Sequence, residues 1–557
     1  MVDVQEPLAR ATGTRTMTGG QALVASLLRQ GIDTIFGLPG VQLDGAFDAL
    51  YDAQARGEVR VIHPRHEQAA AYMADGYARV TGRIGTCMVV PGPGLLNAAA
   101  ALATAYACNQ PVLCVTGQIQ SDMIDVGRGL LHEIPNQLGM VRSVTKHAAR
   151  AVTPQEIPAL VDTAVRALWA GRVRPVEIEI PPDTLFASGE VELLPPPPGR
   201  ERPGGNPDAI RAAARLLGNA EHPIIFAGGG IHVSEAWEEL LALAELLQAP
   251  VITSQNGKGA ISDRHYLSQT SYAARHLLPQ ADVILAVGTR FVEPTTYPWG
   301  IGQESGRTVI KLDIDPAELS RNYPATVGIE ADAKAGLAAL VEATAAHNRA
   351  RPSREKELTA LKQEAAAKLN SVLPQAAFAG AIRRQLPDDG IFVGEMTQIA
   401  YWSNAGFPVY APRTYLTPGY QGTLGWGFPT SLGAKVGAPD RVVVSVNGDG
   451  GFGFALNELA TQARHGIRSI TLVFNDNAYG NVRRIQTEEF GGRTIASDLT
   501  NPDFQKLAEA FGIVGRRATT PGELETQLAE AIAANEPTLI EIPVPPMPNP
   551  WKALALR

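Results

Sequence analysis

The stretch 441–480, RVVVSVNGDGGFGFALNELATQARHGIRSITLVFNDNAYG, decides the fold. Residues 442–446 form a continuous apolar run between a charge and a polar turn, as expected of a strand buried in a parallel sheet. Apolar residues recur at helical spacing over 454–464, and Gly466 is placed to end that helix. Residues 470–474 form a second apolar run. This order predicts one right-handed strand–helix–strand unit with both polar turns at the same edge of the sheet.

The turn after the first strand carries an acidic residue in an unusual place. Residues 448–453 fit the spacing G-x-G-x-x-G, which is typical of nicotinamide or flavin binding. Asp449 lies inside this turn, where its charge repels a phosphate unless a cation lies between them. Asp476, at the end of the neighbouring strand, offers a second hard oxygen ligand. Carboxylate and phosphate oxygens together suit Mg²⁺, so the pattern favours a metal-bridged phosphate, with nucleotide binding as the alternative.

The same stretch resembles the thiamine diphosphate motif of the thiamine-dependent decarboxylases and carboligases, in which a spacer of about this length joins GDG to an Asn/Asp-rich end. The resemblance implies that Asp449 and Asp476 are Mg²⁺ ligands and that the backbone carbonyl of Ala478 is a third. The family more often has Asn where Asp476 stands. The diphosphate-binding set implied by the motif is Gly448, Asp449, Gly450, Gly451, Asp476, Ala478, Tyr479 and Gly480.

Length and composition predict a compact α/β protein of three domains. The chain has 557 residues, 45% apolar and 19% charged, and 55 of them are glycines. The net charge of −8 argues against nucleic acid as a partner. No signal peptide and no membrane-spanning run are found, so we expect a cytoplasmic protein without a membrane partner. Cys87, Cys108 and Cys114 lack metal-site spacing and fit an apolar core in a reducing compartment.

Short apolar runs alternate with helical patterns along the whole chain, which predicts three doubly wound parallel-sheet domains. We expect a mobile segment before a helix at 19–30 that Thr18 caps, and a helix at 68–80 that ends at Gly82. A proline-rich linker at 195–198 and a charged helix at 354–368 separate the domains. The predicted domains are 17–185 (pyrimidine-binding), 206–345 (central) and 375–545 (diphosphate-binding).

Several motifs outside the 441–480 stretch narrow the resemblance to the acetohydroxyacid synthase branch of the thiamine family. Arg65-His66-Glu67 is followed by Ala-Asp-Gly-Tyr-Ala-Arg at 74–79, and further matching motifs occur at 36–40, 91–94, 116–118 and 145–147. The resemblance runs from about Met17 to the end of the chain. It implies that the catalytic Glu67 binds the cofactor pyrimidine and that Leu424 is the apolar wedge that bends the cofactor. Other implied cofactor contacts are Pro39, Glu395, Met396, Thr397, Gln398 and Thr423.

The resemblance also implies partners and a reaction. The expected substrate is a small 2-oxo acid that loses carbon dioxide, after which the product is released or joined to a second carbonyl. The expected assembly is a homodimer or homotetramer whose active site lies between subunits. In this family the central domain often holds FAD or an ADP moiety. The flavin-contacting Gly-x-His-Gly stretch is absent around 268–274, which leaves FAD or ADP binding open.

The chain departs from true acetohydroxyacid synthases at several substrate-pocket positions. The family's Phe-Gln pair is replaced by His132-Glu133, which we consider as catalytic proton-transfer groups, whereas His63 and His66 fit structural roles equally well. Pro294 stands where the family has the arginine that holds the acceptor acid, and such charged pairs are strong. Two more departures are Ile485 in place of a tryptophan and Val41 in place of a glycine.

These departures leave the reaction type open between related activities. An acetolactate synthase-like carboligase is the leading interpretation. The alternatives in the same family are a 2-oxo acid decarboxylase, a 2-hydroxyacyl lyase and a cyclic diketone hydrolase. A flavin- or nicotinamide-dependent oxidoreductase is the alternative from another class. The proline-rich end, 543–551, fits an ordered lid and a simple tail equally well.

Overall fold

The computed structural model describes residues 13–196, 199–290 and 306–554. Within it, β17 (Val443–Gly448) and β18 (Ile470–Asn475) pair in parallel, which confirms the strand–helix–strand unit predicted over 441–480. The prediction of a helix at 454–464 is wrong about where that helix begins. A short helix, α17 (Asp449–Gly453), fills the glycine turn, and α18 covers only Leu459–Arg464. The two are separate because Ala455 adopts φ −134°, outside the helical region.

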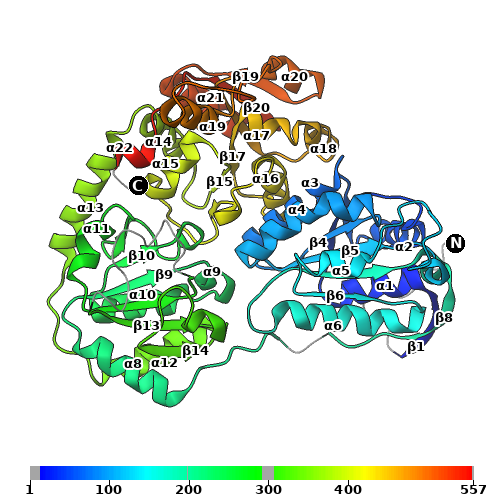
Figure 1. Cartoon of the computed structure of the whole chain (residues 1–557), viewed down its shortest axis with the longest axis horizontal. Helices are drawn as coiled ribbons and strands as arrows, with labels where there is room; N and C mark the ends of the chain where they lie inside the picture. The colour runs from blue at the N-terminus through cyan, green and yellow to red at the C-terminus, as the bar shows by residue number, and fades with distance from the viewer. Residues whose placement is uncertain (1–12, 197–198, 291–305, 555–557) are drawn as a thin grey trace.

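The described residues fold into three domains, each built on a six-stranded sheet in which every strand pair is parallel. Figure 1 shows them as an N-terminal domain in blue and cyan, a central domain in green and a C-terminal domain in yellow to red. The predicted fold class is therefore confirmed. The N-terminal sheet has the order β3 (Arg60–Ile62), β2 (Thr34–Gly37), β4 (Gly85–Val89), β5 (Val112–Gly117), β7 (Val176–Ile180), β6 (His147–Arg150).

The other two sheets follow the same plan. The central sheet has the order β11 (Ser268–Gln269), β10 (Val251–Thr253), β9 (Pro223–Ala227), β12 (Val283–Val287), β13 (Thr308–Asp313), β14 (Val327–Glu330). The C-terminal sheet has the order β16 (Tyr415–Leu416), β15 (Ile391–Gly394), β17, β18, β20 (Thr538–Pro543), β19 (Val514–Arg517). Because the strands are parallel, the turns that follow them in each domain gather at one edge of the sheet, where α/β proteins bind ligands.

Helices cover the sheets. The predicted first helix is α1 (Gly19–Arg29), and Thr18 caps it in a capping box with Gln21. The helix predicted at 68–80 is α3 (Glu67–Thr81), which ends at Gly82 in the left-handed region, φ 68°. The other long helices are α2 (Asp44–Ala55), α4 (Pro93–Cys108), α6 (Ile157–Trp169), α8 (Pro207–Asn219), α10 (Trp237–Leu247), α12 (Ala333–Ala345), α13 (Glu355–Asn370), α14 (Gln375–Gln385), α15 (Gln398–Gly406), α16 (Gly427–Gly437), α19 (Gly480–Glu489) and α21 (Pro521–Ala534).

The two ends of the described chain are more ordered than the sequence suggests. β1 (Thr14–Thr18) pairs antiparallel with β8 (Ser188–Glu192), so the expectation of mobility is wrong for this segment. The partner strand lies far away in the sequence, and nothing local to 14–18 reveals it. At the other end, α22 (Pro550–Ala553) packs on α15, and Gln375 Nε2 donates to the Pro548 carbonyl at 2.6 Å. The proline-rich end is therefore an ordered part of the C-terminal domain.

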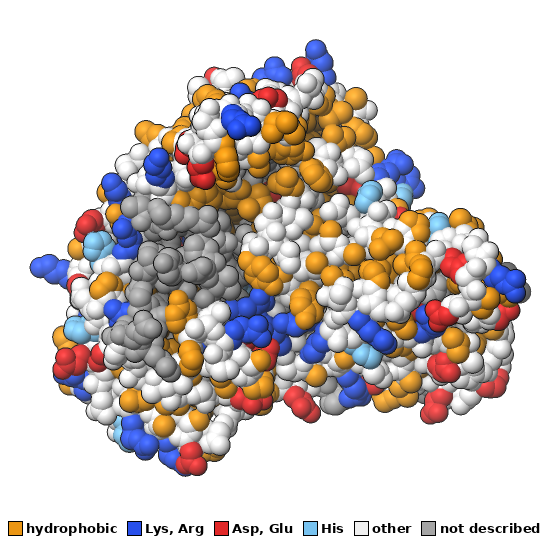
Figure 2. Space-filling model, in the orientation of Figure 1, with side chains coloured by type: hydrophobic (Ala, Val, Ile, Leu, Met, Phe, Trp, Pro, Cys, Tyr) orange, Lys and Arg blue, Asp and Glu red, His pale blue; other side chains and the backbone are white. Residues whose placement is uncertain are grey.

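Among the described residues, no helix is both long and apolar enough to cross a lipid bilayer. Figure 2 shows one face of the molecule, on which charged side chains of both signs are scattered. Cys87, Cys108 and Cys114 are buried, and none forms a disulfide.

The N-terminal and C-terminal domains meet where α3 crosses α16. Glycines make this approach possible, because a Cβ at Gly433 would lie 1.9 Å from the Met73 carbonyl oxygen and one at Gly76 would lie 2.1 Å from that of Thr430. The N–H of Arg65 also donates to the Glu458 carboxylate at 3.0 Å. The backbones therefore touch, and no side chain fits between them.

We expect Gly433→Ala to lower the free energy of unfolding by about 1–3 kcal/mol, because the added methyl overfills a backbone contact. The midpoint of thermal unfolding measures this change. Gly522→Ala is the matched control, since a Cβ there meets nothing within 4 Å. Equal midpoints for the two variants would contradict this account of the crossing.

A second contact between the same domains involves two histidines. The rings of His63 and His465 lie 4.8 Å apart, and the His63 N–H donates to His465 Nε2 at 3.3 Å. Burial, His63 and the charges of Arg464 and Arg60 lower the pKa of His465 to about 4. Burial, and then Arg464 and Arg65, lower the pKa of His63 as well.

Because its folded pKa lies below the unfolded value of about 6.5, neutral His465 stabilises the fold fully above pH 6.5. That contribution is lost as the pH falls from 6.5 towards 4, since the unfolded chain then binds more protons. We expect His465→Asn to reduce the loss of thermal stability between pH 7 and pH 5. Identical pH profiles for wild type and variant would exclude this role for His465.

Candidate active site

Two carboxylates meet at neighbouring strand tips in the C-terminal domain. Asp449 begins α17 directly after β17, Asp476 follows β18, and the register of the strands places their ends side by side. Burial and the charge of Asp449 raise the pKa of Asp476 to about 6, and burial also raises the pKa of Asp449. A cation between the two carboxylates would favour their ionised forms.

An amide that the sequence did not reveal holds this pair in place. Asn501 Nδ2 donates to Asp449 Oδ2 at 2.6 Å and to Asn475 Oδ1 at 2.9 Å. Asn501 lies 52 positions beyond Asp449 in an irregular segment, without a motif that would have marked it. It restrains one carboxylate, as groups around metal ligands commonly do.

Glycines let the chain pass close to the carboxylates, and one of these glycines leaves an open position. A Cβ at Gly480 would lie 2.3 Å from Asp476 Oδ2, and one at Gly450 would lie 2.7 Å from the Tyr479 ring. Gly448 is open, with only Thr397 Cγ2 near it at 3.6 Å. No cluster of three or more His, Cys, Asp or Glu occurs in the described part of the chain. The donors present therefore fit a cation that takes few protein ligands and completes its shell with phosphate oxygens.

Glu395 joins the other side of this turn to the loop after β16. Its side chain is buried, and it accepts the N–H groups of Gly425 at 2.9 Å and Gly427 at 2.8 Å. A Cβ at Gly451 would lie 1.7 Å from Glu395 Oε1. Burial raises the pKa of Glu395 to about 7. The side chain therefore braces the protein, and the cofactor contact that the resemblance implies for Glu395 stays a prediction.

Residues beside Glu395 also have defined positions. Met396 lies against Gly422, where an added Cβ would be 3.2 Å from its Cε. Thr397 caps α15 by accepting the Ala400 N–H at 3.0 Å, and Gln398 Oε1 is buried with no hydrogen-bond partner within the described ranges. These residues line the start of α15, next to the open Gly448.

Leu424 lies between Gly422 and Gly425, whose φ angles of 58° and 76° only glycine adopts readily. Its neighbour Thr423 is fixed by a hydroxyl contact of 3.1 Å with Thr104 of α4. Leu424 therefore lies in a turn that two glycines and the Thr423 contact define, and its role as the apolar wedge stays a prediction.

Glu67 begins α3 in the N-terminal domain. His66 caps the helix by accepting the Gln68 N–H at 3.1 Å, and Asn97 Nδ2 donates to Glu67 Oε2 at 3.0 Å. A Cβ at Gly94 would lie only 3.6 Å from Glu67 Oε1. No contact between Glu67 and Asp449 exists among the described residues of this single chain.

The remaining predicted positions of this domain lie in loops at the same sheet edge. Leu38, before the exposed Pro39, donates its N–H to the Met88 carbonyl at 3.0 Å. His132 Nδ1 lies 3.1 Å from Gln42 Oε1, and a Cβ at Gly92 would meet the His132 carbonyl oxygen at 2.2 Å.

Glu133 accepts the Leu130 N–H at 2.8 Å, and this backbone bond lowers the pKa of its carboxyl group. The Glu133 side chain therefore stabilises the turn formed by residues 130–133. The structure brings His132 close to the Gly92–Gly94 turn beside Glu67. The Glu133 side chain, by contrast, makes a local hydrogen bond with the backbone of Leu130.

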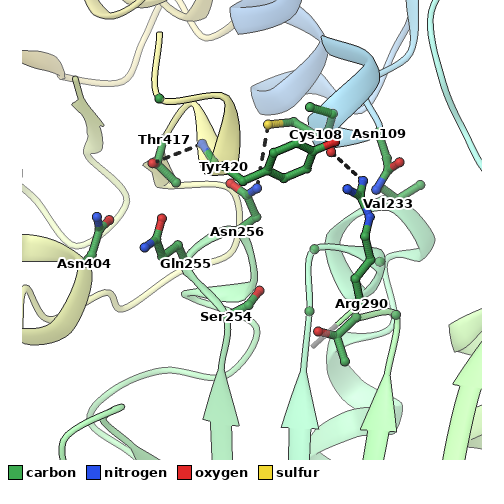
Figure 3. Close-up of a pocket in the computed structure, with 18 of the residues that line it drawn as sticks. Cys108, Asn109, Val233, Ser254, Gln255, Asn256, Arg290, Asn404, Thr417 and Tyr420 are labelled. Carbon is green, nitrogen blue, oxygen red and sulfur yellow. Dashed lines mark hydrogen bonds between the residues drawn. The ribbon is translucent and has the colours of Figure 1, made fainter. Parts of the chain in front are cut away.

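A cavity of about 660 Å³ lies where the three domains meet (Figure 3). The central domain lines it with Gly228–Gly230 and Arg290, whose Nη2 donates to the Ala107 carbonyl at 2.6 Å. Arg290 also stacks 4.9 Å above the Tyr420 ring. The C-terminal domain contributes Ile485, which replaces the expected tryptophan. Pro294, where the acceptor-binding arginine was expected, lies outside the described residues.

Comparison with known proteins agrees with this arrangement. Three family models match the chain: the N-terminal TPP binding domain of thiamine pyrophosphate enzymes over 17–140, their central domain over 210–340 and their C-terminal TPP binding domain over 395–542. The chain therefore belongs to the thiamine pyrophosphate enzyme family.

Relatives within the family indicate the type of enzyme. The chain is 35% identical to a probable acetolactate synthase large subunit of Methanocaldococcus jannaschii, over 95% of this chain and 92% of the relative. It is 36% identical to a probable 2-ketoarginine decarboxylase of Pseudomonas aeruginosa, over 95% and 94%. The acetolactate synthase of Arthrospira platensis is 31% identical over 95% and 94%. The chain is a thiamine diphosphate-dependent carboligase or decarboxylase.

We expect Glu395→Gln to lower the free energy of unfolding by about 1–3 kcal/mol. The carboxylate accepts two backbone N–H groups, whereas the amide nitrogen of Gln would face one of them as a second donor. Thermal unfolding with and without thiamine diphosphate measures the effect. Glu342→Gln, an exposed position on α12, is the control. A Glu395→Gln variant as stable as this control would show that the brace is unimportant.

Proposed function

We propose that this protein is a Mg²⁺- and thiamine diphosphate-dependent enzyme that decarboxylates a 2-oxo acid and then, like an acetolactate synthase, joins the remaining unit to a second carbonyl compound. The observation that carries the proposal is the placement of two carboxylates, Asp449 and Asp476, at adjacent strand tips, where both can share one cation. Both side chains and the Ala478 carbonyl would hold Mg²⁺. The open turn at Gly448 would receive the diphosphate.

When bound, thiamine diphosphate supplies the electron sink that the loss of carbon dioxide requires. Glu67 would hold a proton between its carboxyl group and the pyrimidine nitrogen, and Asn97 orients that carboxyl group. Leu424 would press the cofactor into its bent form from the turn between two glycines. His132 and Glu133 remain proposed proton-transfer groups, with His132 the better supported because it lies beside the Gly92 turn.

We also propose that the working unit is a homodimer, or a homotetramer built from such dimers. Within one described chain, Glu67 and the carboxylate pair make no contact, so a partner would have to bring a second N-terminal domain to the pair. Large apolar side chains are exposed on both surfaces concerned. They are Val41, Leu96, Val126 and Leu131 on the N-terminal domain, and Phe454, Val482, Phe490 and Ile495 on the C-terminal domain.

A decarboxylase that releases its product without joining it to an acceptor is the second candidate. It is favoured by the 36% identical relative named as a 2-ketoarginine decarboxylase. It is also favoured by Ile485 and Pro294, which replace residues that acetohydroxyacid synthases use for the acceptor. FAD or an ADP moiety remains a proposed occupant of the cavity beside Gly228–Gly230, and a cytoplasmic location remains part of the proposal.

The proposal predicts that the metal- and cofactor-free protein is inactive and that thiamine diphosphate plus Mg²⁺ together restore activity. Incubation with pyruvate and a panel of 2-oxo acids, followed by product analysis, separates acetolactate-type products from aldehydes. In Glu67→Gln we expect activity to fall by about 10²–10⁴-fold, the usual contribution of a positioned acid or base.

Isothermal titration should show that Glu67→Gln still binds the cofactor, because Gln fills the same volume and the diphosphate site lies in another domain. Asp449→Asn should instead lose cofactor binding, which separates the two roles. A Glu67→Gln enzyme with wild-type rates would remove the assigned role. Activity that is indifferent to thiamine diphosphate would remove the whole proposal.

A further inference from the structure

The C-terminal domain lines the cavity with hydrogen-bond donors. Arg484 of α19, together with Tyr401 and Asn404 of α15, lies on this wall. The Arg484 side chain is 15% exposed. It pairs with Glu488 at 3.0 Å and donates Nη2 to Asn481 Oδ1 at 3.0 Å. Its Nε is buried and has no hydrogen-bond partner among the residues that the structure describes.

The neighbouring amides have already used their acceptor atoms. Asn404 Oδ1 accepts the Tyr415 hydroxyl at 2.8 Å, and Asn481 Oδ1 accepts Arg484. Each amide also has an NH₂ group that can donate a hydrogen bond. Figure 3 shows Asn404 at the side of the cavity. The Tyr401 hydroxyl makes no side-chain hydrogen bond within the described ranges, and burial raises its pKa to about 12, so it stays a donor. A wall of unused donors selects an anion.

The other arginines of the cavity are less available. Arg172 is paired with Asp315 at 3.1 Å and also with Glu318. Arg200 lies 3.8 Å from Asp332. Arg290 is bound to the Ala107 carbonyl. Arg484 differs because its only acidic partner, Glu488, is 42% exposed and therefore screened by water.

Two carboxylates on the same wall, Glu395 and Glu489, do not prevent an anion from binding near Arg484. Both oxygens of Glu395 accept backbone N–H groups. Glu489 is exposed, so water solvates its charge. The Arg484 guanidinium is more shielded from water than Glu488 or Glu489, and a carboxylate in the cavity would satisfy its buried Nε.

The chemistry decides which carboxylate this site would hold. In decarboxylation the bond between the carbonyl carbon and the carboxylate breaks, and the carboxylate leaves as neutral carbon dioxide. An arginine bound to that carboxylate would stabilise the substrate more than the transition state and so slow the reaction. An arginine bound to a carboxylate that is retained has no such cost.

We infer that Arg484, assisted by Tyr401 and Asn404, binds the carboxylate that survives the reaction. That carboxylate is either the second acidic group of a 2-oxo diacid or the carboxylate of an acceptor 2-oxo acid. The inference rests on the proposed function. It gives the role lost at Pro294 to a residue of α19 that lines the cavity.

The test compares Arg484→Gln with wild type, using the full-length enzyme loaded with thiamine diphosphate and Mg²⁺. One arm measures carbon dioxide release from 2-oxoglutarate against the monoacid 2-oxopentanoate. The other arm measures ligation of pyruvate to 2-oxobutyrate at varied acceptor concentration. We expect KM for 2-oxoglutarate or for the acceptor to rise about 10-fold or more, as for a lost charged hydrogen bond. The arm that responds identifies the source of the carboxylate.

Arg483→Gln is the matched control, because this neighbour on α19 pairs with Asp498 at 3.1 Å, is 42% exposed and does not line the cavity. Arg484→Lys should recover part of the affinity, since it restores the charge without the fork of donors. Calorimetric binding of glutarate, which cannot react, gives a readout free of catalysis. Wild type and Arg483→Gln should bind it more tightly than Arg484→Gln.

Unchanged KM values and unchanged glutarate binding in Arg484→Gln would overturn the inference. So would a wild-type preference for a 2-oxo acid with a cationic tail that Arg484→Gln leaves intact or improves. If wild type acts on no 2-oxo acid, the proposed function fails, and the glutarate arm alone then decides whether Arg484 binds a carboxylate.

Discussion

The repulsion between Asp449 and Asp476 is the constraint on which the rest of this structure depends. Burial raises the pKa of both carboxylates, and the charge of Asp449 raises that of Asp476 further. The fold accepts this cost because the neighbouring turns are built from glycines and leave space for phosphate. Asn501 then holds one carboxylate from a distant segment. A site of this kind has a use only when a cation and an anionic ligand arrive together.

Close backbone contacts connect the domain that holds the acidic pair to the N-terminal domain. The crossing of α3 and α16 joins the N-terminal domain, which carries Glu67, to the C-terminal domain, which carries the acidic pair. Glu395 ties the loop that presents Leu424 to the turn that begins with Asp449. A rigid framework of this kind suits an enzyme in which a bent cofactor must meet groups from two domains at fixed distances.

The cavity between the domains shows how one family scaffold can change its substrate. The chain keeps the cofactor-binding motifs of its family, yet several positions that acetohydroxyacid synthases use for their acceptor differ. The polar groups on α15 and α19 instead form a wall of donors facing the same space. Because the wall comes from surface residues of two helices, it can change without disturbing the carboxylate pair.

Local patterns in the sequence were sufficient for the strand–turn–helix–strand unit, the cap at Thr18, the helix end at Gly82 and the roles proposed for Asp449 and Asp476. The strands, the cap and the helix end depend on residues a few positions apart, whose spacing follows from the periods of helix and strand. The roles of the two aspartates depend on a family motif contained in one continuous stretch of about forty residues. The predicted start of α18 was wrong because the backbone of Ala455 leaves the helical region. An alanine side chain gives no sign of this conformation in the sequence.

The pairing of β1 with β8, the amide of Asn501 on Asp449, the brace of Glu395 and the donor wall at Arg484 were decided by tertiary structure alone. Their partners lie up to 178 positions apart in the sequence, as Thr14 and Glu192 do. Such contacts leave no local period or motif, since only the folded backbone brings the two sides within hydrogen-bonding distance. The sequence thus determined the family and its cofactor chemistry, and the packing of the three domains determined what surrounds them.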